Sequence, residues 1–234
     1  MRKIPYVIDR EDFESAKNAR WPREYHDALE EFSGMIDRRS TEPPIQTFLE
    51  QHPYLLPGLG TFHHGPYAGI VISKFPLGND FVTDFAFVSS NSQMLRLICI
   101  EIESARKHLF RKDGAFHRDY VDARQQIVDW LHWANQNPKQ AIDCWRPLLN
   151  RKHLLYCTVQ YQGFLVMGRR SDIDTRKKQE RWSAEAESMS PHLGCMTYDR
   201  LIERAEWLVP RMDNDTIATC TYKDRRFQAK HIIS

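Results

Sequence analysis

The sequence contains no long hydrophobic run and no paired-cysteine motif. No apolar stretch approaches the roughly 18 residues that a membrane-crossing helix needs. The N-terminus, Met1-Arg2-Lys3-Ile4-Pro5, lacks the apolar core of a signal peptide. The five cysteines are widely spaced, without a Cys-x-x-Cys pair, which disfavours a structural zinc site and a disulfide framework and favours a reducing compartment. We therefore expect a cytoplasmic protein with no membrane partner.

Net charge is also almost absent. The chain has 33 Lys and Arg residues against 31 Asp and Glu residues, which gives a formal net charge of +2. Such a balance neither predicts nor excludes nucleic-acid binding, because that binding depends on a local basic patch rather than on the total charge. The 234 residues, 41% of them hydrophobic, are enough for one large domain or two small ones.

The pattern of apolar and polar residues divides the chain into three parts. Residues 11–38 are rich in Ala, Glu, Arg and Lys and carry apolar residues near helical spacing, so we expect helices there, interrupted at Trp21-Pro22. We predict an N-terminal helical segment at 1–40, a main domain at 41–210 and a C-terminal tail at 211–234.

The main domain is predicted to hold a mixed sheet flanked by helices. After a short helix at 45–50, strands are expected at 70–75, 81–88, 95–103, 154–159, 164–167 and 193–198, with an edge strand in the tail near 216–222. Helices are expected at 117–135, 171–188 and 199–208. Gln162-Gly163 is interpreted as the turn between two of the strands. This order of elements fits the α/β class.

Carboxylates interrupt two of the apolar strands. Asp84 lies within the strand at 81–88, and Glu101 and Glu103 lie at the end of the strand at 95–103. A core strand normally excludes such residues, because burying an unpaired charge is costly. Side chains alternate along a strand, so Glu101 and Glu103 share a face, on which Asp84 converges if the strands are neighbours. These oxygen ligands suit Mg²⁺ or Mn²⁺. Carboxylates facing solvent on an edge strand are the alternative that the spacing leaves open.

Three polar residues on the neighbouring helices extend this pattern. Glu50 lies on the helix before the sheet, where a fourth carboxylate would reach the site. Gln125 and Gln126 lie on the helix directly after the last of these strands, and a glutamine there can bind a metal-bound water or a phosphate. Taken singly, each of these side chains is also typical of a solvated helix face.

A short basic run follows the second carboxylate strand. Its members are Arg106, Lys107, Arg111 and Lys112. Basic side chains placed just after a catalytic strand would contact a DNA backbone. A solvated loop is the alternative, and Arg169-Arg170 leaves the same choice between a phosphate contact and a solvated strand end.

The arrangement of an Asp and a Glu-x-Glu on paired strands resembles that of the PD-(D/E)xK nucleases. A series of further motifs occurs in the order found in one family. They lie at 45–56, 77–78, 83–85, 100–103, 109–114, 123–130, 166–169 and 197–201. Together they cover about residues 45–208 and resemble the Shedu family of prokaryotic anti-phage defence proteins, which carry a nuclease domain of this type.

This resemblance implies a restriction-endonuclease-like core, a divalent metal, a DNA substrate and a homo-oligomer. The expected function is that of a metal-dependent DNA endonuclease that hydrolyses phosphodiester bonds in anti-phage defence. Asp84 and Glu101 would bind Mg²⁺ or Mn²⁺, and Glu103 would ligate the metal or position the attacking water. Gln126 would assist, with Gln125 as its competitor.

Glu103 departs from the pattern that the resemblance implies, because many PD-(D/E)xK members have lysine at this position. A carboxylate can ligate a metal or act as a base, but it supplies no positive charge. Lys107 or Lys112 would then reach in from the following segment. Two other functions stay open: a nuclease-fold DNA-binding or sensor module with impaired cleavage, and a DNA repair nuclease.

Overall fold

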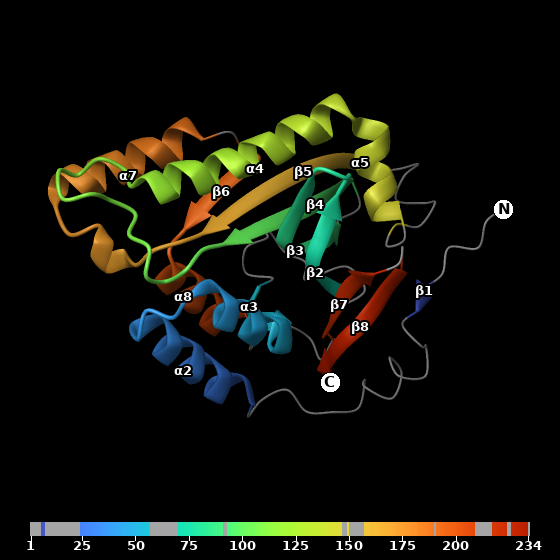
Figure 1. The fold of residues 1–234 in the computed structure, drawn as a ribbon, viewed down its shortest axis with the longest axis horizontal. Coiled ribbons are helices and arrows are strands. Elements are labelled where there is room, and N and C mark those ends of the chain that lie inside the picture. The colour runs from blue at the N-terminus through green and yellow to red at the C-terminus, as the bar shows by residue number, and fades with distance from the viewer. Residues whose placement is uncertain are drawn as a thin grey trace.

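One mixed sheet runs through the computed structural model, with helices on both of its faces (Figure 1). The structure describes residues 6–7, 24–56, 70–90, 93–146, 149, 157–189, 191–208, 217–223 and 226–233. The helix predicted before Trp21-Pro22 and the beginning of the strand predicted at 154–159 lie outside these residues. The predicted α/β class is confirmed, and the architecture is consistent with a restriction-endonuclease-like fold.

Eight strands form the sheet in the order β1-β8-β7-β2-β3-β4-β5-β6. They are β1 (Tyr6–Val7), β2 (Ile70–Leu77), β3 (Phe81–Ser90), β4 (Met94–Ile102), β5 (Thr158–Val166), β6 (Leu193–Met196), β7 (Ile217–Lys223) and β8 (Arg226–Ile233). Strands β2, β3 and β4 are antiparallel neighbours. Strands β5 and β6 continue the sheet in parallel with β4, so the sheet is antiparallel in its middle and parallel beyond β4.

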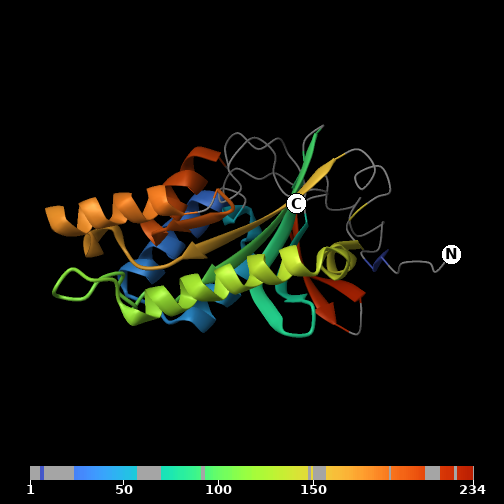
Figure 2. The ribbon, with the colours of Figure 1, turned by 90° about the horizontal axis from the view of Figure 1, so that it is seen from above.

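The helices form a layer on each face of the sheet (Figures 1 and 2). They are α2 (Glu24–Asp37), α3 (Glu42–Gln51), α4 (Arg118–Gln136), α5 (Pro138–Trp145), α7 (Arg176–Ser188) and α8 (Tyr198–Leu208), with short 3-10 turns η1 (Pro53–Leu55) and η5 (Arg170–Asp172). Helices α2, α3 and α8 cover one face, and α4, α5 and α7 cover the other (Figure 1). In the described part of the chain, no helix is both long and apolar enough to cross a membrane.

The alternation of side chains along β4 separates two hydrophobic cores. Ile98 and Ile100 belong to the core under α2, α3 and α8, whereas Leu97 and Cys99 belong to the core under α4 and α5. By the same alternation, Glu101 points to the side of α4. Trp130 of α4 and Trp145 of α5 are buried in this second core.

Helix α2 packs into the first core through its aromatic residues. The rings of Phe32 and Phe48 stack with centroids 5.5 Å apart, and the ring of Phe32 meets Tyr198 of α8 edge-on at 6.1 Å. The helix predicted in this part of the N-terminal segment is therefore confirmed, and it is held against α3 and α8 by apolar contact.

The predicted turn at Gln162-Gly163 is wrong, because both residues lie inside the continuous strand β5. A Cβ added to Gly163 would come within 2.2 Å of the Ile127 side chain on α4. Glycine here therefore permits close packing of the helix on the sheet and does not mark a turn. Helix α5 was not predicted. It begins at Pro138, shortly after the end of the helix predicted at 117–135, because proline is tolerated in a first helical turn.

The predicted edge strand near 216–222 exists as β7 but is not at an edge. It pairs in parallel with β2 on one side and antiparallel with β8 on the other. Beyond β7, strand β8 extends the sheet and pairs in parallel with β1 on its other side, so β7 is an inner strand.

Candidate active site

Three charged side chains lie in a row across the middle of the sheet. The pairing of Phe85 with Ile100 places Asp84 of β3 directly beside Glu101 of β4. On the other side, the β2–β3 register places Lys74 of β2 beside Asp84. The row therefore runs Lys74, Asp84, Glu101, with one residue from each strand, and it brings together two of the predicted site residues.

The Asp84 carboxylate is buried and held from two sides. The main-chain N–H of Ile102 donates to its Oδ2 atom at 2.8 Å. The Lys74 ammonium donates to its Oδ1 atom and forms an ion pair with it. The first contact fixes the orientation of the carboxylate on the sheet, and the second supplies a mobile cation, because nearly half of the Lys74 side chain is exposed.

Glu101 is less well compensated than Asp84. The Nε2 atom of Gln126 on α4 donates to its Oε1 atom at 3.0 Å. This contact decides between the two predicted glutamines, since Gln125 is exposed and donates to Asp129 instead, at 2.8 Å. Burial, and next the negative charge of Asp84, raise the pKa of the Glu101 carboxyl well above its ordinary value. The position thus favours a proton or a metal cation.

Glu103 lies just beyond β4 and is held mainly by its backbone. Its N–H donates to the carbonyl of Val166 at 3.0 Å, and its carbonyl accepts a hydrogen bond from the Tyr198 hydroxyl. The side chain pairs with Lys107, whose Nζ lies 2.5 Å from Oε2. Of the two lysines expected to reach toward the site, Lys107 does so, whereas Lys112 is exposed on the following loop.

Glu42 is a further carboxylate near this row. It begins α3, and burial together with the charges of Asp84 and Glu103 raises the pKa of its carboxyl. Glu50, buried near the other end of α3, accepts hydrogen bonds from Ser73 and from Gln46. The same Gln46 amide donates to the main-chain carbonyl of Asp84 at 3.3 Å, so one side chain bridges Glu50 and Asp84, and the role of Glu50 as a fourth carboxylate stays a prediction.

The predicted basic run makes contacts within the protein. Arg106 donates from Nε to the carbonyl of Arg39 at 3.0 Å. Arg111 pairs with Asp113, and Lys107 pairs with Glu103. Lys112 is the fourth member and is exposed. The surface charge here is therefore more balanced than the sequence alone predicts.

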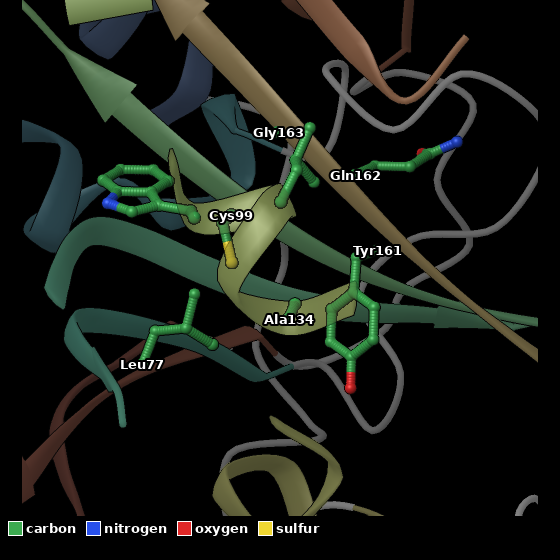
Figure 3. Close-up of a pocket in the computed structure, with 8 residues that line it drawn as sticks. Leu77, Cys99, Ala134, Tyr161, Gln162 and Gly163 are labelled. Atoms are coloured by element: carbon green, nitrogen blue, oxygen red, sulfur yellow. The ribbon is translucent and has the colours of Figure 1, made fainter. Parts of the chain in front are cut away.

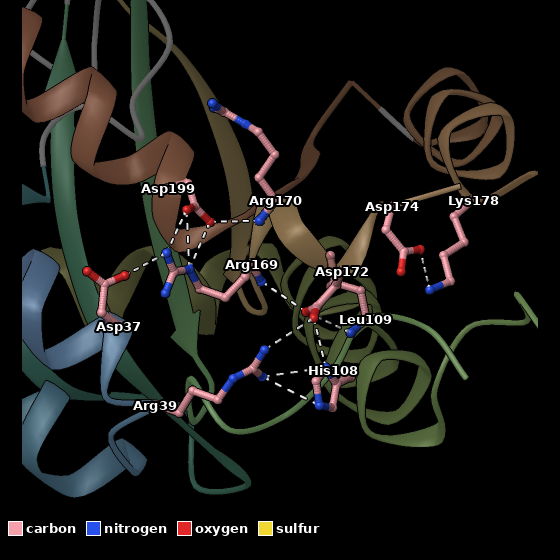
Figure 4. A network of polar contacts seen from close by, with 10 residues as sticks. All are labelled: Asp37, Arg39, His108, Leu109, Arg169, Arg170, Asp172, Asp174, Lys178 and Asp199. Atoms are coloured by element: carbon pink, nitrogen blue, oxygen red, sulfur yellow. Dashed lines mark hydrogen bonds and ion pairs between the residues drawn. The ribbon is translucent and has the colours of Figure 1, made fainter. Parts of the chain in front are cut away.

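Arg169 takes part in a separate polar network (Figure 4). Its guanidinium pairs with Asp199 of α8 at 3.0 Å and with Asp37 of α2 at 2.9 Å. The adjacent Asp172 accepts from the N–H of Arg169 at 3.0 Å and lies 2.7 Å from the His108 ring. Arg169 thus joins two helices and is not a solvated strand end, whereas a phosphate contact by Arg169-Arg170 stays a prediction.

A small, mostly apolar crevice lies between α4 and strands β2, β4 and β5 (Figure 3). Leu77, Cys99 and Ala134 are among its lining residues. It contains no acidic or basic side chain, so it offers no chemistry of its own. Cys99 lies two residues before Glu101 on β4, which places the crevice beside the charged row and under the same helix.

The residues of the row suit a divalent cation of the Mg²⁺ type. In the part of the chain that the structure describes, no three His, Cys, Asp or Glu side chains form a ready-made metal cage. Mg²⁺ needs no such cage, because it commonly binds through one or two carboxylates and keeps several waters. Asp84 and Glu101 are oxygen donors of this kind, and the ammonium group on Asp84 marks a place where a cation is favourable.

The sheet, its two helical layers and the carboxylates at its centre define an α/β domain of the restriction-endonuclease-like type. The family profile described as "Shedu protein SduA, C-terminal" matches residues 39–202. Because this match covers most of the chain, the protein belongs to the Shedu family, and membership points to anti-phage defence as its setting. No curated protein matched the sequence.

Proposed function

We propose that this protein is a metal-dependent DNA endonuclease of anti-phage defence. One observation carries the proposal: buried Asp84 and half-buried Glu101 lie side by side on paired strands, with their orientations fixed by Ile102 and Gln126. Acids that share one place away from bulk solvent, without enough cations to neutralise them, are typical of functional sites such as those that bind a metal. Family membership supports the defence setting.

In the proposed mechanism, Asp84 and Glu101 would hold Mg²⁺ or Mn²⁺, which would lower the pKa of water and stabilise negative charge on the phosphate. The N–H of Ile102 holds Oδ2 of Asp84, and the amide of Gln126 holds Oε1 of Glu101. The metal would take the place of the Lys74 ammonium at Oδ1 of Asp84. Preorganised ligands of this kind need no rearrangement during the reaction.

Glu103 is proposed to position the attacking water and accept its proton. Its backbone is fixed by Val166 and Tyr198, while its carboxylate is only paired with the partly exposed Lys107. Lys107 can therefore leave Glu103 for a phosphate without disturbing the strand. Together with Arg106, Arg111 and Lys112, it is the proposed contact to the DNA backbone.

A nuclease-fold binding or sensor module is the second candidate function. The pairing of Glu103 with Lys107 supports it, because the carboxylate is neutralised where many related nucleases have a free lysine. A repair nuclease would use the same chemistry in another pathway. Loss of protection in a phage challenge of cells that carry an Asp84→Asn variant would favour defence over repair. We also propose that the protein forms a homo-oligomer.

Plasmid cleavage tests the proposal directly. We expect the purified protein to cut supercoiled plasmid with Mg²⁺ or Mn²⁺ and to stop in EDTA. Asp84→Asn and Glu101→Gln should each remove the cleavage while thermal unfolding stays cooperative. Asp129→Asn is the matched control, because Asp129 is an exposed acid on α4 outside the row. Equal cleavage by the wild type and Asp84→Asn would contradict the proposed site, and DNA binding without cleavage by the wild type would contradict an enzyme.

A further inference from the structure

Lys74 has an unusual backbone for a residue in the middle of a strand. Its φ angle is 49°, in the left-handed region that non-glycine residues seldom occupy. The flanking pairs, Ser73 with Phe85 and Phe75 with Thr83, keep a common register. Lys74 is therefore a local irregularity inside an otherwise regular antiparallel pair.

This irregularity changes which side chains of β2 point to the core. Ile70 and Ile72 belong to the core under α4 and α5, and strict alternation would add Lys74 to the same side. Phe75 and Leu77 take those places instead. The left-handed residue thus resets the alternation, so that the strand buries Phe75 and keeps the Lys74 ammonium at the row of acids.

A lysine is energetically unfavourable in this left-handed backbone conformation. Glycine adopts this φ without a Cβ clash, and asparagine tolerates it better than lysine does. If β2 needed only the change in alternation, either residue would provide it. Strained non-glycine residues that persist are concentrated at functional sites, which directs attention to what the Lys74 side chain does.

The Lys74 ammonium faces the acids of the row and not solvent alone. It pairs with Asp84, and the charges of Glu42 and Glu101 also act on it. By contrast, Lys107 lies on a loop and pairs with Glu103 four residues before it, in an ordinary local ion pair. Lys74 is thus the lysine that stands directly beside a proposed metal ligand.

We propose that Lys74 is a catalytic residue that provides, from the neighbouring strand β2, the positive charge that Glu103 cannot provide. This inference rests on the proposed endonuclease function. With a divalent metal held at Asp84 and Glu101, the Lys74 ammonium would turn from the Asp84 carboxylate toward the scissile phosphate. About half of the side chain is already exposed (49%), so the move needs no change in the strand.

The reaction balances with Lys74 protonated throughout. The oxygen of water forms a bond to phosphorus, and the ester P–O bond breaks. The proton of the water passes to the Glu103 carboxylate, and the leaving oxygen takes a proton from solvent. Lys74 donates a hydrogen bond to a non-bridging phosphate oxygen, where negative charge grows in the transition state.

Substitutions that keep the left-handed backbone separate this role from a structural one. Lys74→Asn and Lys74→Gly remove the charge and suit φ 49° better than lysine does. Lys74→Arg keeps the charge, and Lys139→Asn, at an exposed site on α5 outside the row, is the matched control. Single-turnover cleavage at saturating Mg²⁺, DNA affinity in Ca²⁺, and the thermal midpoint are measured for each.

We expect Lys74→Asn and Lys74→Gly to lower the cleavage rate about 100-fold, the scale for loss of one transition-state donor. Their DNA affinity should stay within about threefold of the wild type, since one phosphate contact is only part of the interface. Their thermal midpoints should stay near that of the wild type, because relief of the left-handed backbone opposes the loss of the ion pair with Asp84. Lys74→Arg should retain more activity than Lys74→Asn. Half-maximal cleavage should need less Mn²⁺ in Lys74→Asn, because the competing ammonium is gone.

The outcomes that overturn the inference are distinct from those that overturn the proposed function. If Asp84→Asn is inactive but Lys74→Asn cleaves like the wild type, Lys74 has no catalytic role and the endonuclease function stands. If Lys74→Asn loses activity only because its thermal midpoint falls, the role is structural. If the wild type shows no metal-dependent cleavage, the proposed function fails and this inference fails with it.

Discussion

The two groups of acids in this protein, each with a buried member, differ in how their charge is compensated. In the network of Figure 4, Asp199 accepts hydrogen bonds from the Arg169 guanidinium and from the N–H of Arg170 at 2.7 Å. Asp172 is likewise surrounded by N–H donors, from Arg169 and Leu109, and by the ring of His108. These acids have cations and main-chain donors on several sides.

The row across β2, β3 and β4 is the contrasting case. Glu101 has a neutral amide as its hydrogen-bond donor and an acid, Asp84, as its neighbour. The only cation that touches Asp84 among the described contacts is the half-exposed Lys74. A network in which every acid has donors or cations makes a protein more rigid. A group of acids with too few of them is instead typical of a site that binds a ligand.

The pKa shifts of Asp199 and Glu101 have opposite signs. At Asp199, burial alone would raise the pKa, but the hydrogen bonds from Arg169 and the N–H of Arg170 outweigh it and lower the pKa below its ordinary value. At Glu101, burial and the charge of Asp84 both raise the pKa. The comparison therefore teaches that Asp199 stabilises the fold in its charged form, whereas Glu101 holds a negative charge only at a cost.

Removing a charge from the row should have the largest effect. We expect this effect on the cleavage rate and no loss of stability. We expect Asp84→Asn to lower metal-dependent cleavage by about 1,000-fold or more, the upper end of what one preorganised electrostatic group contributes. Because the substitution also removes repulsion from Glu101, the free energy of unfolding should be unchanged or slightly higher without metal. Urea unfolding in EDTA measures this. A large loss of stability would show that the row resembles the Asp199 network after all.

Removing a charge from the network should have the opposite result. Arg169→Ala leaves Asp199 and Asp37 without their guanidinium partner. We expect a loss of about 2 kcal/mol in the free energy of unfolding, the scale of a hydrogen bond to a charged group, with the cleavage rate per folded molecule near that of the wild type. Chemical denaturation and single-turnover cleavage check the two halves. Cleavage that falls at unchanged stability would contradict a purely structural role for Arg169.

Glu103 lies between these two cases, because its carboxylate is paired with a cation, Lys107, whose side chain is partly exposed. We expect Glu103→Gln to reduce cleavage roughly 10-fold to 100-fold, less than Asp84→Asn, since it removes a proton acceptor but no proposed metal ligand. Glu103→Lys restores the pattern common in PD-(D/E)xK nucleases. With Lys74 already at the row, the added lysine should be redundant and cleavage should stay below that of the wild type. A rate above the wild type would instead favour the impaired binding module.

The parts of the site that a local pattern determines were predictable from sequence. Alternation along β4 places Glu101 on a defined face, and the apolar run around Asp84 marks a buried strand. Helical periodicity places both Gln125 and Gln126 near the end of β4, but only the packing of α4 on the sheet selects Gln126.

The site residues that the sequence did not predict, Lys74 and Glu42, are placed by long-range strand register or by backbone conformation. Lys74 joins the site because β2 pairs with β3 and because one φ angle is positive, and the only sequence signal is the break in alternation between Ile72 and Phe75. Glu42 reaches the acids from the first turn of α3, whereas Glu50 on the same helix is buried behind β2. Ion pairs such as Arg169 with Asp199 join residues 30 positions apart, and no local pattern encodes them.

The smallest expected effect is a difference in how stability depends on pH. Glu101 has a raised pKa, so the folded state holds its proton more tightly and stability falls as pH rises above the unfolded carboxyl value of about 4.3. Asp199 has a lowered pKa, so its contribution is present above its unfolded value of about 3.9 and is lost as pH falls through the folded value. The two acids therefore act in different pH ranges and with opposite slopes.

Unfolding free energies between about pH 3 and pH 9, measured in EDTA, separate the two contributions. We expect Glu101→Gln to flatten the decline on the neutral side, by at most about 1.4 kcal/mol per pH unit. Asp199→Asn should be less stable than the wild type at neutral pH but lose less on acidification. The acids Asp84, Glu42 and Glu103 and the cation Lys74 also face Glu101, so Glu101→Gln is compared with Asp84→Asn, which should flatten the same side. Curves of unfolding free energy against pH could instead run parallel to the wild type for both Glu101→Gln and Asp199→Asn. Glu101 and Asp199 would then be compensated alike, and the distinction between a structural network and a ligand-binding site would fail.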